Sequence, residues 1–181
     1  FKRILIQDST VFKLPNSQYG NFSGVSNGKV VRALARLQIC FDICTSSIVQ
    51  SELCTYSQND SYYAPKILDV IKPGDLIIRD LGYFSIPVFR AISKLGAFYI
   101  SKHKKNICIT DNQGDTIDLV KYLKSLDRSK IESFDMEVKI GMKEKLDVRI
   151  CGQRCDQEQA MKNRKHMKSA RHKDGKISAK S

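Results

Sequence analysis

Two short apolar runs in this chain each end in an aspartate. KRILIQD (residues 2–8) ends at Asp8, and DLIIRD (residues 75–80) ends at Asp80. Both runs have the composition of β-strands, and an apolar strand that ends in a carboxylate places negative charge at the edge of a packed sheet. Side by side, two such strands can share a divalent cation. The chain is therefore constrained to a sheet that brings distant segments together.

The size and composition indicate a globular protein with one core, or one core plus a subdomain. The chain has 181 residues, of which 41% are hydrophobic and 28% charged. It begins at Phe1 rather than Met and ends at Ser181 in a polar stretch, so we expect a piece of a longer protein. No signal peptide or membrane span is visible, and no membrane partner is expected. The six Cys are scattered, which favours free thiols in a reducing, cytoplasmic compartment.

The net charge of +12 suggests a polyanionic partner, most often nucleic acid. Basic residues concentrate in the last part of the chain and in a turn after residue 101. A solvated basic helix and turn are the plain alternative, whereas a phosphate-contacting surface would lose affinity steeply with salt. The candidate DNA-contacting cations are Lys102, Lys104, Lys105, Arg154, Arg164, Lys165 and Lys168.

The first half of the chain predicts a mixed α/β sheet, because paired strands are followed by alternating helices and strands. Asn59 to Ser61 and Ser85 are expected to cap the two helices. Residues 30–37 also fit a helix, since Ala and Leu favour one. The expected elements are a loop over 9–29, paired strands over about 33–43 and 47–54, a helix over 62–72, a strand over 75–80, a helix over 86–95 and a strand over 97–102.

After residue 102 the pattern becomes rich in β-structure. It predicts a strand over 107–110, a helix over 117–126, a hairpin of 134–141 with 146–152, and a solvated basic helix over 156–173.

The two carboxylates would repel each other unless a proton or a cation lies between them. At an effective dielectric of about 20, a pair about 4 Å apart costs roughly 4 kcal/mol. A divalent metal removes this cost and polarises a phosphodiester, and oxygen ligands suit Mg²⁺, with Mn²⁺ as a substitute. The alternative is a turn role, since Asp after a strand commonly binds nearby backbone N–H groups. That role better explains Asp42, Asp60, Asp75, Asp111 and Asp115.

The local sequences favour the metal-binding interpretation. IQDST (6–10) and GDLIIRDLGYFS (74–85) resemble the first and second catalytic-Asp motifs of bacterial insertion-sequence transposases with a DDE active site. In the group of these transposases that the chain resembles, the second motif is commonly Asp-Arg-Gly-Tyr and the third is Y-R-E-K. ARLQICFDICTSSIVQSEL and AFYISK resemble further strands of that domain. TIDLVKYLKSL, FDMEVKIG and KLDVRICGQR resemble the β-rich insertion before the third motif, so the resemblance covers nearly the whole chain.

The resemblance implies a ribonuclease H-like mixed sheet with flanking helices over residues 1–102. Residues 103–181 would form a β-rich insertion subdomain with a basic C-terminal helix or tail. Asp8 would lie on the central strand and Asp80 at the end of the fourth, both binding Mg²⁺. Tyr83 would be a supporting or DNA-contacting residue, and Gly82 would permit a tight turn. The implied partners are transposon-end and target DNA, and the full-length protein would be a homodimer.

The chain departs from that family in two places. Leu81 stands where the second motif commonly has Arg. No Y-x-x-R-x-x-x-E pattern follows residue 100, so the third carboxylate is expected beyond Ser181 and this fragment alone is expected to be inactive. Two alternatives stay open, namely a ribonuclease H-like nuclease that only hydrolyses and a non-catalytic DNA-binding remnant of a transposase.

A zinc site is a weaker hypothesis. The spacing of Cys151, Cys155, His166 and His172 is near that of a zinc finger. The middle gap is short and lacks the apolar residues that pack such a finger, and Cys151 belongs to a strand-like run.

Overall fold

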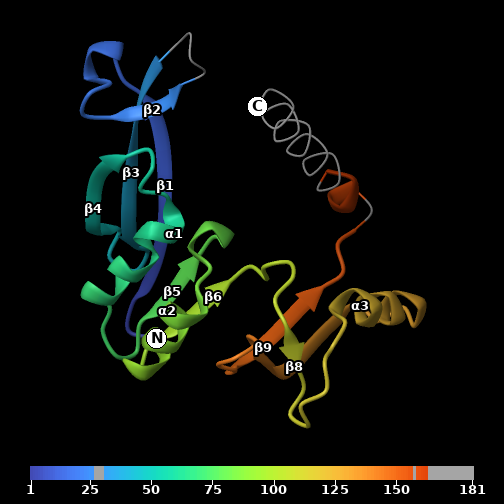
Figure 1. Cartoon of the computed structure of the whole chain (residues 1–181). Helices are drawn as coiled ribbons and strands as arrows, with labels where there is room; N and C mark the ends of the chain where they lie inside the picture. The colour runs from blue at the N-terminus through green and yellow to red at the C-terminus, as the bar shows by residue number, and fades with distance from the viewer. Residues whose placement is uncertain (27–30, 157, 163–181) are drawn as a thin grey trace. The chain divides into compact units, whose positions relative to one another are not determined.

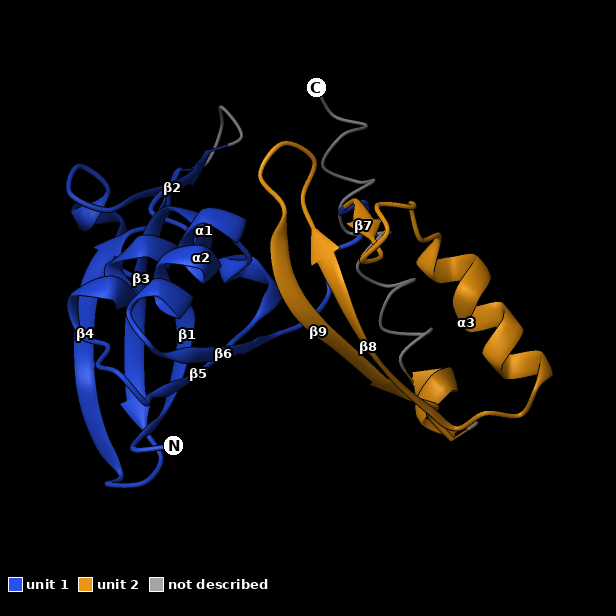
Figure 2. Ribbon diagram, turned by 90° about the horizontal axis from the view of Figure 1, so that it is seen from below, with its two compact units in different colours: residues 1–107 blue, residues 108–181 orange. Residues whose placement is uncertain are grey.

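The structure, a computed structural model, describes residues 1–26, 31–156 and 158–162. It divides the chain into two compact units, residues 1–107 and 108–181 (Figure 2). The boundary placed at residue 102 from the sequence falls inside the first unit. In the part of the chain that the structure describes, no helix is both long and apolar enough to cross a bilayer.

Unit 1 is a mixed sheet with short helices (Figure 1). Its elements are β1 (Ile4–Lys13), η1 (Asn16–Gln18), β2 (Ser23–Ser26), β3 (Val31–Asp42), β4 (Ser47–Thr55), α1 (Asp60–Tyr63), η2 (Ala64–Asp69), β5 (Leu76–Arg79), η3 (Leu81–Tyr83), α2 (Ile86–Lys94) and β6 (Phe98–Ser101), where η denotes a 3-10 helix.

The topology of the unit 1 sheet is ribonuclease H-like, as the resemblance implied. The path β4-β3-β1-β5-β6 runs across the sheet, and β2 also pairs with β3. The strands β1, β3 and β4 are antiparallel, whereas β5 is parallel to both β1 and β6. The chain must cross over to make each parallel pair, and the segments with α1, η2 and α2 provide these connections.

The helices cover one face of the sheet. Phe89 of α2 stacks on Tyr99 of β6 with 4.3 Å between the ring centroids, and the guanidinium of Arg79 donates to the carbonyl oxygen of Ala64 in η2 at 2.7 Å. Leu5 of β1 on the same face is fully buried. This covered face holds the core of unit 1.

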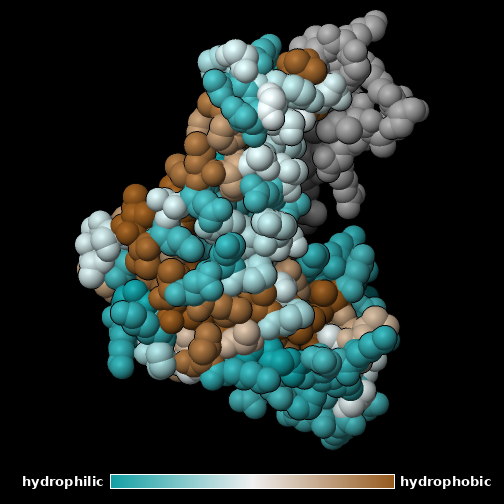
Figure 3. Space-filling model, turned by 60° about the vertical axis from the view of Figure 1, so that its left-hand side comes forward, coloured by the Kyte–Doolittle hydropathy of each residue, from teal (hydrophilic) through white to brown (hydrophobic). Residues whose placement is uncertain are grey.

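The opposite face of the unit 1 sheet is apolar and open. One row of directly paired residues crosses all five strands of the path, and Ile6 at its centre is 37% exposed. In the space-filling view, apolar side chains gather over a broad area of the surface (Figure 3). The residues of this apolar row are Ile48, Phe41, Ile6, Ile78 and Ile100.

Several local expectations need correction. The strand that contains Asp8 does not end there but continues to Lys13, because β3 is long enough to pair with it as far as Leu34. The helix expected over 62–72 is one α-turn followed by a 3-10 helix. The side chain of Ser85 makes no capping hydrogen bond at α2, whereas Gly96 ends that helix with φ +71° as expected.

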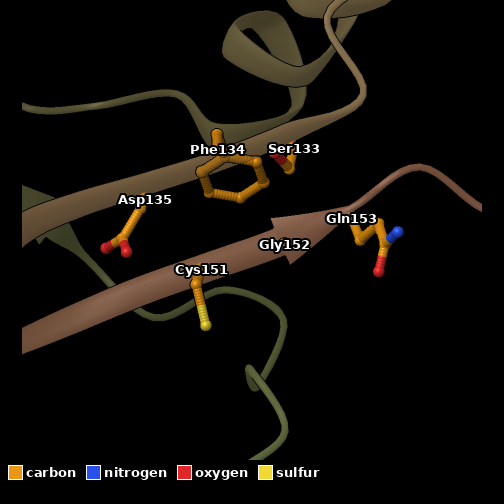
Figure 4. Close-up of a pocket in the computed structure, with 6 residues that line it drawn as sticks. All are labelled: Ser133, Phe134, Asp135, Cys151, Gly152 and Gln153. Atoms are coloured by element: carbon orange, nitrogen blue, oxygen red, sulfur yellow. The ribbon is translucent and has the colours of Figure 1, made fainter.

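Unit 2 is a three-stranded antiparallel sheet with the helix α3 (Leu119–Arg128), and residues 158–162 are also helical. The predicted hairpin of two long strands is present, and Phe134 lies opposite Gly152 near its open end (Figure 4). A Cβ atom on Gly152 would lie 2.4 Å from the Phe134 ring, so only glycine permits this contact. Tyr122 of the helix packs edge-on against Phe134 at 5.7 Å. The elements are β7 (Ile109–Thr110), α3 (Leu119–Arg128), β8 (Ser133–Ile140) and β9 (Leu146–Gln153).

A buried ion pair ties the beginnings of β1 and β5 together. Asp75 is 1% exposed and accepts hydrogen bonds from Arg3 at 2.5 and 3.0 Å and from the backbone N–H of Lys72 at 2.7 Å. Burial acts to raise the pKa of Asp75, but these hydrogen bonds and the charge of Arg3 outweigh it, and the pKa is lowered.

We expect Asp75→Asn to reduce the free energy of unfolding at pH 7 by about 2–3 kcal/mol. The pKa of Asp75 is lower in the folded protein than in the unfolded chain. The contribution of its carboxylate to the free energy of unfolding is therefore complete above the unfolded pKa of about 3.9, and it is lost as the pH falls through the folded pKa. Urea unfolding of both proteins between pH 7 and pH 2 measures this. The two proteins should converge at low pH, and a constant difference would contradict the assignment.

Candidate functional site

Asp8 and Asp80 occupy equivalent positions on neighbouring parallel strands. Gln7 of β1 and Arg79 of β5 are partners in the ladder, and the two aspartates directly follow them. Neighbouring strands lie about 4.8 Å apart, and paired residues direct their side chains to the same face. Both aspartates are exposed, where β5 ends and β1 continues. The register therefore places Asp8 and Asp80 at neighbouring positions on the open side of the sheet.

Asp8 and Asp80 form a short row across β1 and β5, the carboxylate row, and Lys102, directly after β6, continues it. Ser101 is the partner of Arg79 in the β5–β6 ladder, so Lys102 directly follows it beside Asp80. Its ammonium donates to Oδ1 of Asp80 at 2.7 Å. This bond lowers the pKa of the Asp80 carboxyl and raises the pKa of Lys102, and the charge of Asp8 adds to the rise. Both carboxylates thus act on one cation.

The donor set of Asp8 and Asp80 fits a hard divalent cation. Carboxylate oxygens are the ligands that Mg²⁺ and Mn²⁺ prefer, and the pair already attracts the ammonium of Lys102. Within residues 1–26, 31–156 and 158–162, no group of three or more His, Cys, Asp or Glu is placed to hold a metal. The described chain therefore offers two carboxylate ligands rather than a complete set.

A shallow hollow of about 180 Å³ adjoins Asp8 on the open face. Its walls combine the aspartate and two hydroxyl residues with apolar side chains of β1 and β3. An extended phosphodiester or a protein segment could reach the carboxylates from this side without displacing the core. The lining residues are Ile6, Asp8, Ser9, Thr10, Ile39 and Phe41.

The turn after Asp80 is fixed from inside the core. Tyr83 is completely buried, its hydroxyl donates to Oε1 of Gln38, and its backbone N–H donates to the carbonyl oxygen of Asp80 at 3.1 Å. Burial and the charge of Asp60 raise the pKa of Tyr83. Because its side chain is inaccessible, the expectation that Tyr83 contacts DNA is corrected in favour of the supporting role.

Gly82 serves this turn for a different reason from the expected one. Its φ does not lie in the left-handed region, so the turn itself does not demand glycine. A Cβ atom there would lie 2.5 Å from Oδ2 of Asp60. Gly82 is therefore needed for the close approach of Asp60.

Asp60 is the site-adjacent residue that the sequence interpretation missed. The helix cap is Asn59, whose side chain accepts from the backbone N–H of Tyr62 at 3.0 Å. Asp60 instead accepts from Ser9, Arg36 and Gln38. The only signal in the sequence was that Asn59 alone suffices to cap the helix.

Arg79 anchors the end of β5 beneath the carboxylates. It is 3% exposed, bonds to the carbonyl oxygen of Ala64, and lies 5.4 Å from the centroid of the Tyr83 ring. Burial lowers the pKa of Arg79 to about 10. These contacts fix the last residue of β5, which directly precedes Asp80.

The predicted DNA-contacting cations separate into three groups. Lys104 and Lys105 are exposed in the turn after Lys102, and the ammonium of Lys104 lies 5.9 Å from the Phe84 ring. Arg154 in unit 2 is paired with Asp127 at 2.8 Å. The remaining three, Arg164, Lys165 and Lys168, lie outside the described residues.

The zinc hypothesis is not supported by the part of the chain that the structure describes. Cys151 and Cys155 are exposed free thiols, and Cys151 lies in β9 (Figure 4). His166 and His172 lie outside the described residues.

The sheet topology and the neighbouring aspartates indicate a ribonuclease H-like protein, and comparison with known proteins identifies its family. The family model described as "Transposase DDE domain" matches residues 1–176. The chain therefore belongs to the transposase DDE domain family.

Its relatives are transposases of bacterial insertion sequences. The transposase of element IS231B from Bacillus thuringiensis subsp. berliner is 35% identical over 106 residues, which is 59% of this chain and 22% of that protein. The transposase of element IS1151 from Clostridium perfringens is 31% identical over the same shares. The matched segment thus covers about a fifth of the length of these transposases.

Among solved structures, the piggyBac transposase synaptic complex with hairpin DNA aligns with a TM-score of 0.44 and 13% identity. The alignment covers 85% of this chain and 33% of that one, and a likeness of this size lends no further support to the fold.

We expect Lys102→Met to raise the pKa of the Asp80 carboxyl toward its usual value, because the main hydrogen bond to the carboxylate is lost. Carbon-detected NMR titration of the Asp side chains measures this. Lys104→Met is the matched control, since the Lys104 ammonium makes no ion pair in the described structure, and it should leave the Asp80 titration unchanged. An unchanged Asp80 titration in Lys102→Met would show that the ion pair does not form in solution.

Proposed function

We propose that this chain is the central part of a transposase that cleaves DNA strands at transposon ends and joins them to target DNA. The observation that carries the proposal is the placement of Asp8 and Asp80 at equivalent positions on adjacent parallel strands. Membership of the transposase DDE domain family supports it.

In this proposal Asp8 and Asp80 hold Mg²⁺, or Mn²⁺ as a substitute. When bound, the ion would polarise the scissile phosphodiester and stabilise charge on its oxygens. The chain's own residues supply the surroundings. Arg79 and Tyr83 fix the end of β5 from below, and Lys102 offers a positive charge beside Asp80, where the phosphate would lie.

A third carboxylate would come from a segment of the longer transposase beyond Ser181. The described residues supply two ligands, and related transposases are much longer than this chain. The apolar row beside Asp8 offers such a segment a surface on which to pack, because it is exposed and reaches across the sheet. The fragment by itself would then bind metal weakly and transfer no strands.

The proposed partners are transposon-end and target DNA, with a homodimer bridging two ends in the full-length protein. The charge of +12 supports a polyanionic partner. Lys104 and Lys105 are exposed beside the carboxylate row and would contact the phosphate backbone. Assays of the full-length protein for strand joining as well as nicking separate a transposase from a nuclease that only hydrolyses.

We expect the 181-residue chain to bind Mn²⁺ weakly, with Asp8→Asn and Asp80→Asn each abolishing the binding because one ligand is lost. Electron paramagnetic resonance of free and bound Mn²⁺ measures the affinity. Asp115→Asn, an exposed turn residue of unit 2, should bind as the parent does. Strand transfer by this chain that is lost in Asp8→Ala would refute the need for a further ligand.

We expect duplex DNA binding to weaken with salt, and Lys104→Gln with Lys105→Gln to reduce the slope of log K against log salt by about 2, since each phosphate contact contributes about 0.9. Fluorescence anisotropy over a range of KCl concentrations measures both slopes. Lys66→Gln with Lys94→Gln is a control of equal charge on exposed positions of unit 1. Equal slopes in the two double variants would place the DNA elsewhere.

A further inference from the structure

The carboxylate of Asp60 is the meeting point of a hydrogen-bond network on the covered side of unit 1. Its Oδ1 accepts from Ser9 Oγ at 2.6 Å, from Arg36 Nη1 at 2.9 Å and from Gln38 Nε2 at 3.3 Å. Arg36 also donates to Ser9 Oγ at 2.8 Å. One oxygen therefore holds side chains of β1 and β3 to the beginning of α1.

The same carboxylate touches the segment that carries Asp80. Its Oδ2 lies where a Cβ atom on Gly82 would be 2.5 Å away, so the two are in direct contact only because residue 82 is glycine. Gln38, which donates to Asp60, accepts from the hydroxyl of Tyr83. The turn after β5 is thus held at two adjacent residues, Gly82 by its contact with Asp60 and Tyr83 by its hydrogen bond to Gln38.

These contacts reach within two residues of both candidate metal ligands. Ser9 directly follows Asp8 in β1, and because side chains alternate along a strand, it points to the covered side while Asp8 points to the open side. Gly82 lies two residues after Asp80, and the backbone of Tyr83 bonds to that of Asp80. The network lies beneath the carboxylate row rather than in it.

We propose that Asp60 is a positioning residue that holds Asp8 and Asp80 in register and thereby sets the affinity of the pair for a divalent cation. The inference rests on the proposed function, since it assumes that these two aspartates bind the ion. Asp60 itself does not touch the ion. It acts through Ser9 on one strand and through Gly82 and Tyr83 on the other.

The ion pair of Arg3 with Asp75 provides a comparison within the same chain. It also ties the β1 and β5 segments together, but before the strands begin, whereas Asp60 acts just after β5 ends. A purely structural role for Asp60 predicts that disrupting either interaction has the same consequences. A positioning role predicts that only the Asp60 contacts affect metal binding.

The test measures Mn²⁺ affinity by electron paramagnetic resonance and melting temperature by circular dichroism on the 181-residue chain. The variants are Asp60→Asn, Gly82→Ala and Asp75→Asn. Asp60→Asn removes the charge that holds Arg36, whereas Gly82→Ala pushes on the Asp60 carboxylate without changing any charge. All affinities are measured at a temperature at which each variant is folded.

We expect Asp60→Asn and Gly82→Ala each to weaken Mn²⁺ binding about tenfold, as changes around metal ligands commonly do, and Asp75→Asn to lower the melting temperature while leaving the affinity unchanged. If Asp60→Asn does not fold, Gly82→Ala decides the question. Unchanged affinity in the folded Asp60 and Gly82 variants, or equal loss in Asp75→Asn, would overturn the inference. Binding that survives Asp8→Asn and Asp80→Asn would instead overturn the proposed function.

Discussion

The parallel pairing of β1 with β5 is the interaction on which the candidate site depends. The ladder runs from Ile4 with Leu76 to Gln7 with Arg79 and then stops, because β5 ends while β1 continues beside β3. The next residue on each strand is an aspartate. A shift of one residue in this pairing would send one carboxylate to the covered face, so the register itself determines whether the two can act together.

The two faces of the unit 1 sheet differ in composition and in their roles in folding and function. The covered face buries polar groups such as Gln7, Gln38 and Arg79, each 3% exposed or less, beneath α1, η2 and α2. The open face carries the apolar row centred on Ile6. Burying a side chain of that size fully contributes about 1.5–3 kcal/mol. A segment that packs on the row would therefore be stabilised there, and the same packing would bring it close to Asp8. The polar groups beneath the strands hold the carboxylates, and the apolar row offers a docking surface beside them.

Much of the fold could be predicted from the sequence, because alternation and apolar runs report strands directly. The pairs over 33–43 with 47–54 and 134–141 with 146–152, and the strand before Asp80, all lie close to their expected places. The extension of β1 to Lys13 was missed, because residues 9–13 lack strong alternation and pair only through β3. A local pattern cannot show a partner that is distant along the chain.

The same limit applies to the site. Asp8 and Asp80 could be found because each follows an apolar run within a recognisable motif, but their register depends on a crossover that no local pattern encodes. Asp60 looked like a cap residue, and its role appears only when Ser9, Arg36 and Gly82 meet around it. The burial of Tyr83 was likewise unpredictable, since a tyrosine in a turn is often exposed.

The position of Lys102 explains how such a site can exist before a metal or DNA is bound. Two carboxylates on adjacent strands repel each other, and the repulsion grows as their separation decreases. The next strand of the sheet supplies the compensating charge at the same level, and the ammonium of Lys102 bonds to Asp80 while the charge of Asp8 also acts on it. Both partners are exposed, so the pair is weak and exchangeable. In the proposed function, a divalent ion would neutralise the carboxylates in place of Lys102 and release its ammonium to contact a phosphate. The same side chain would then first compensate the negative charge of the two carboxylates and later help to bind the substrate.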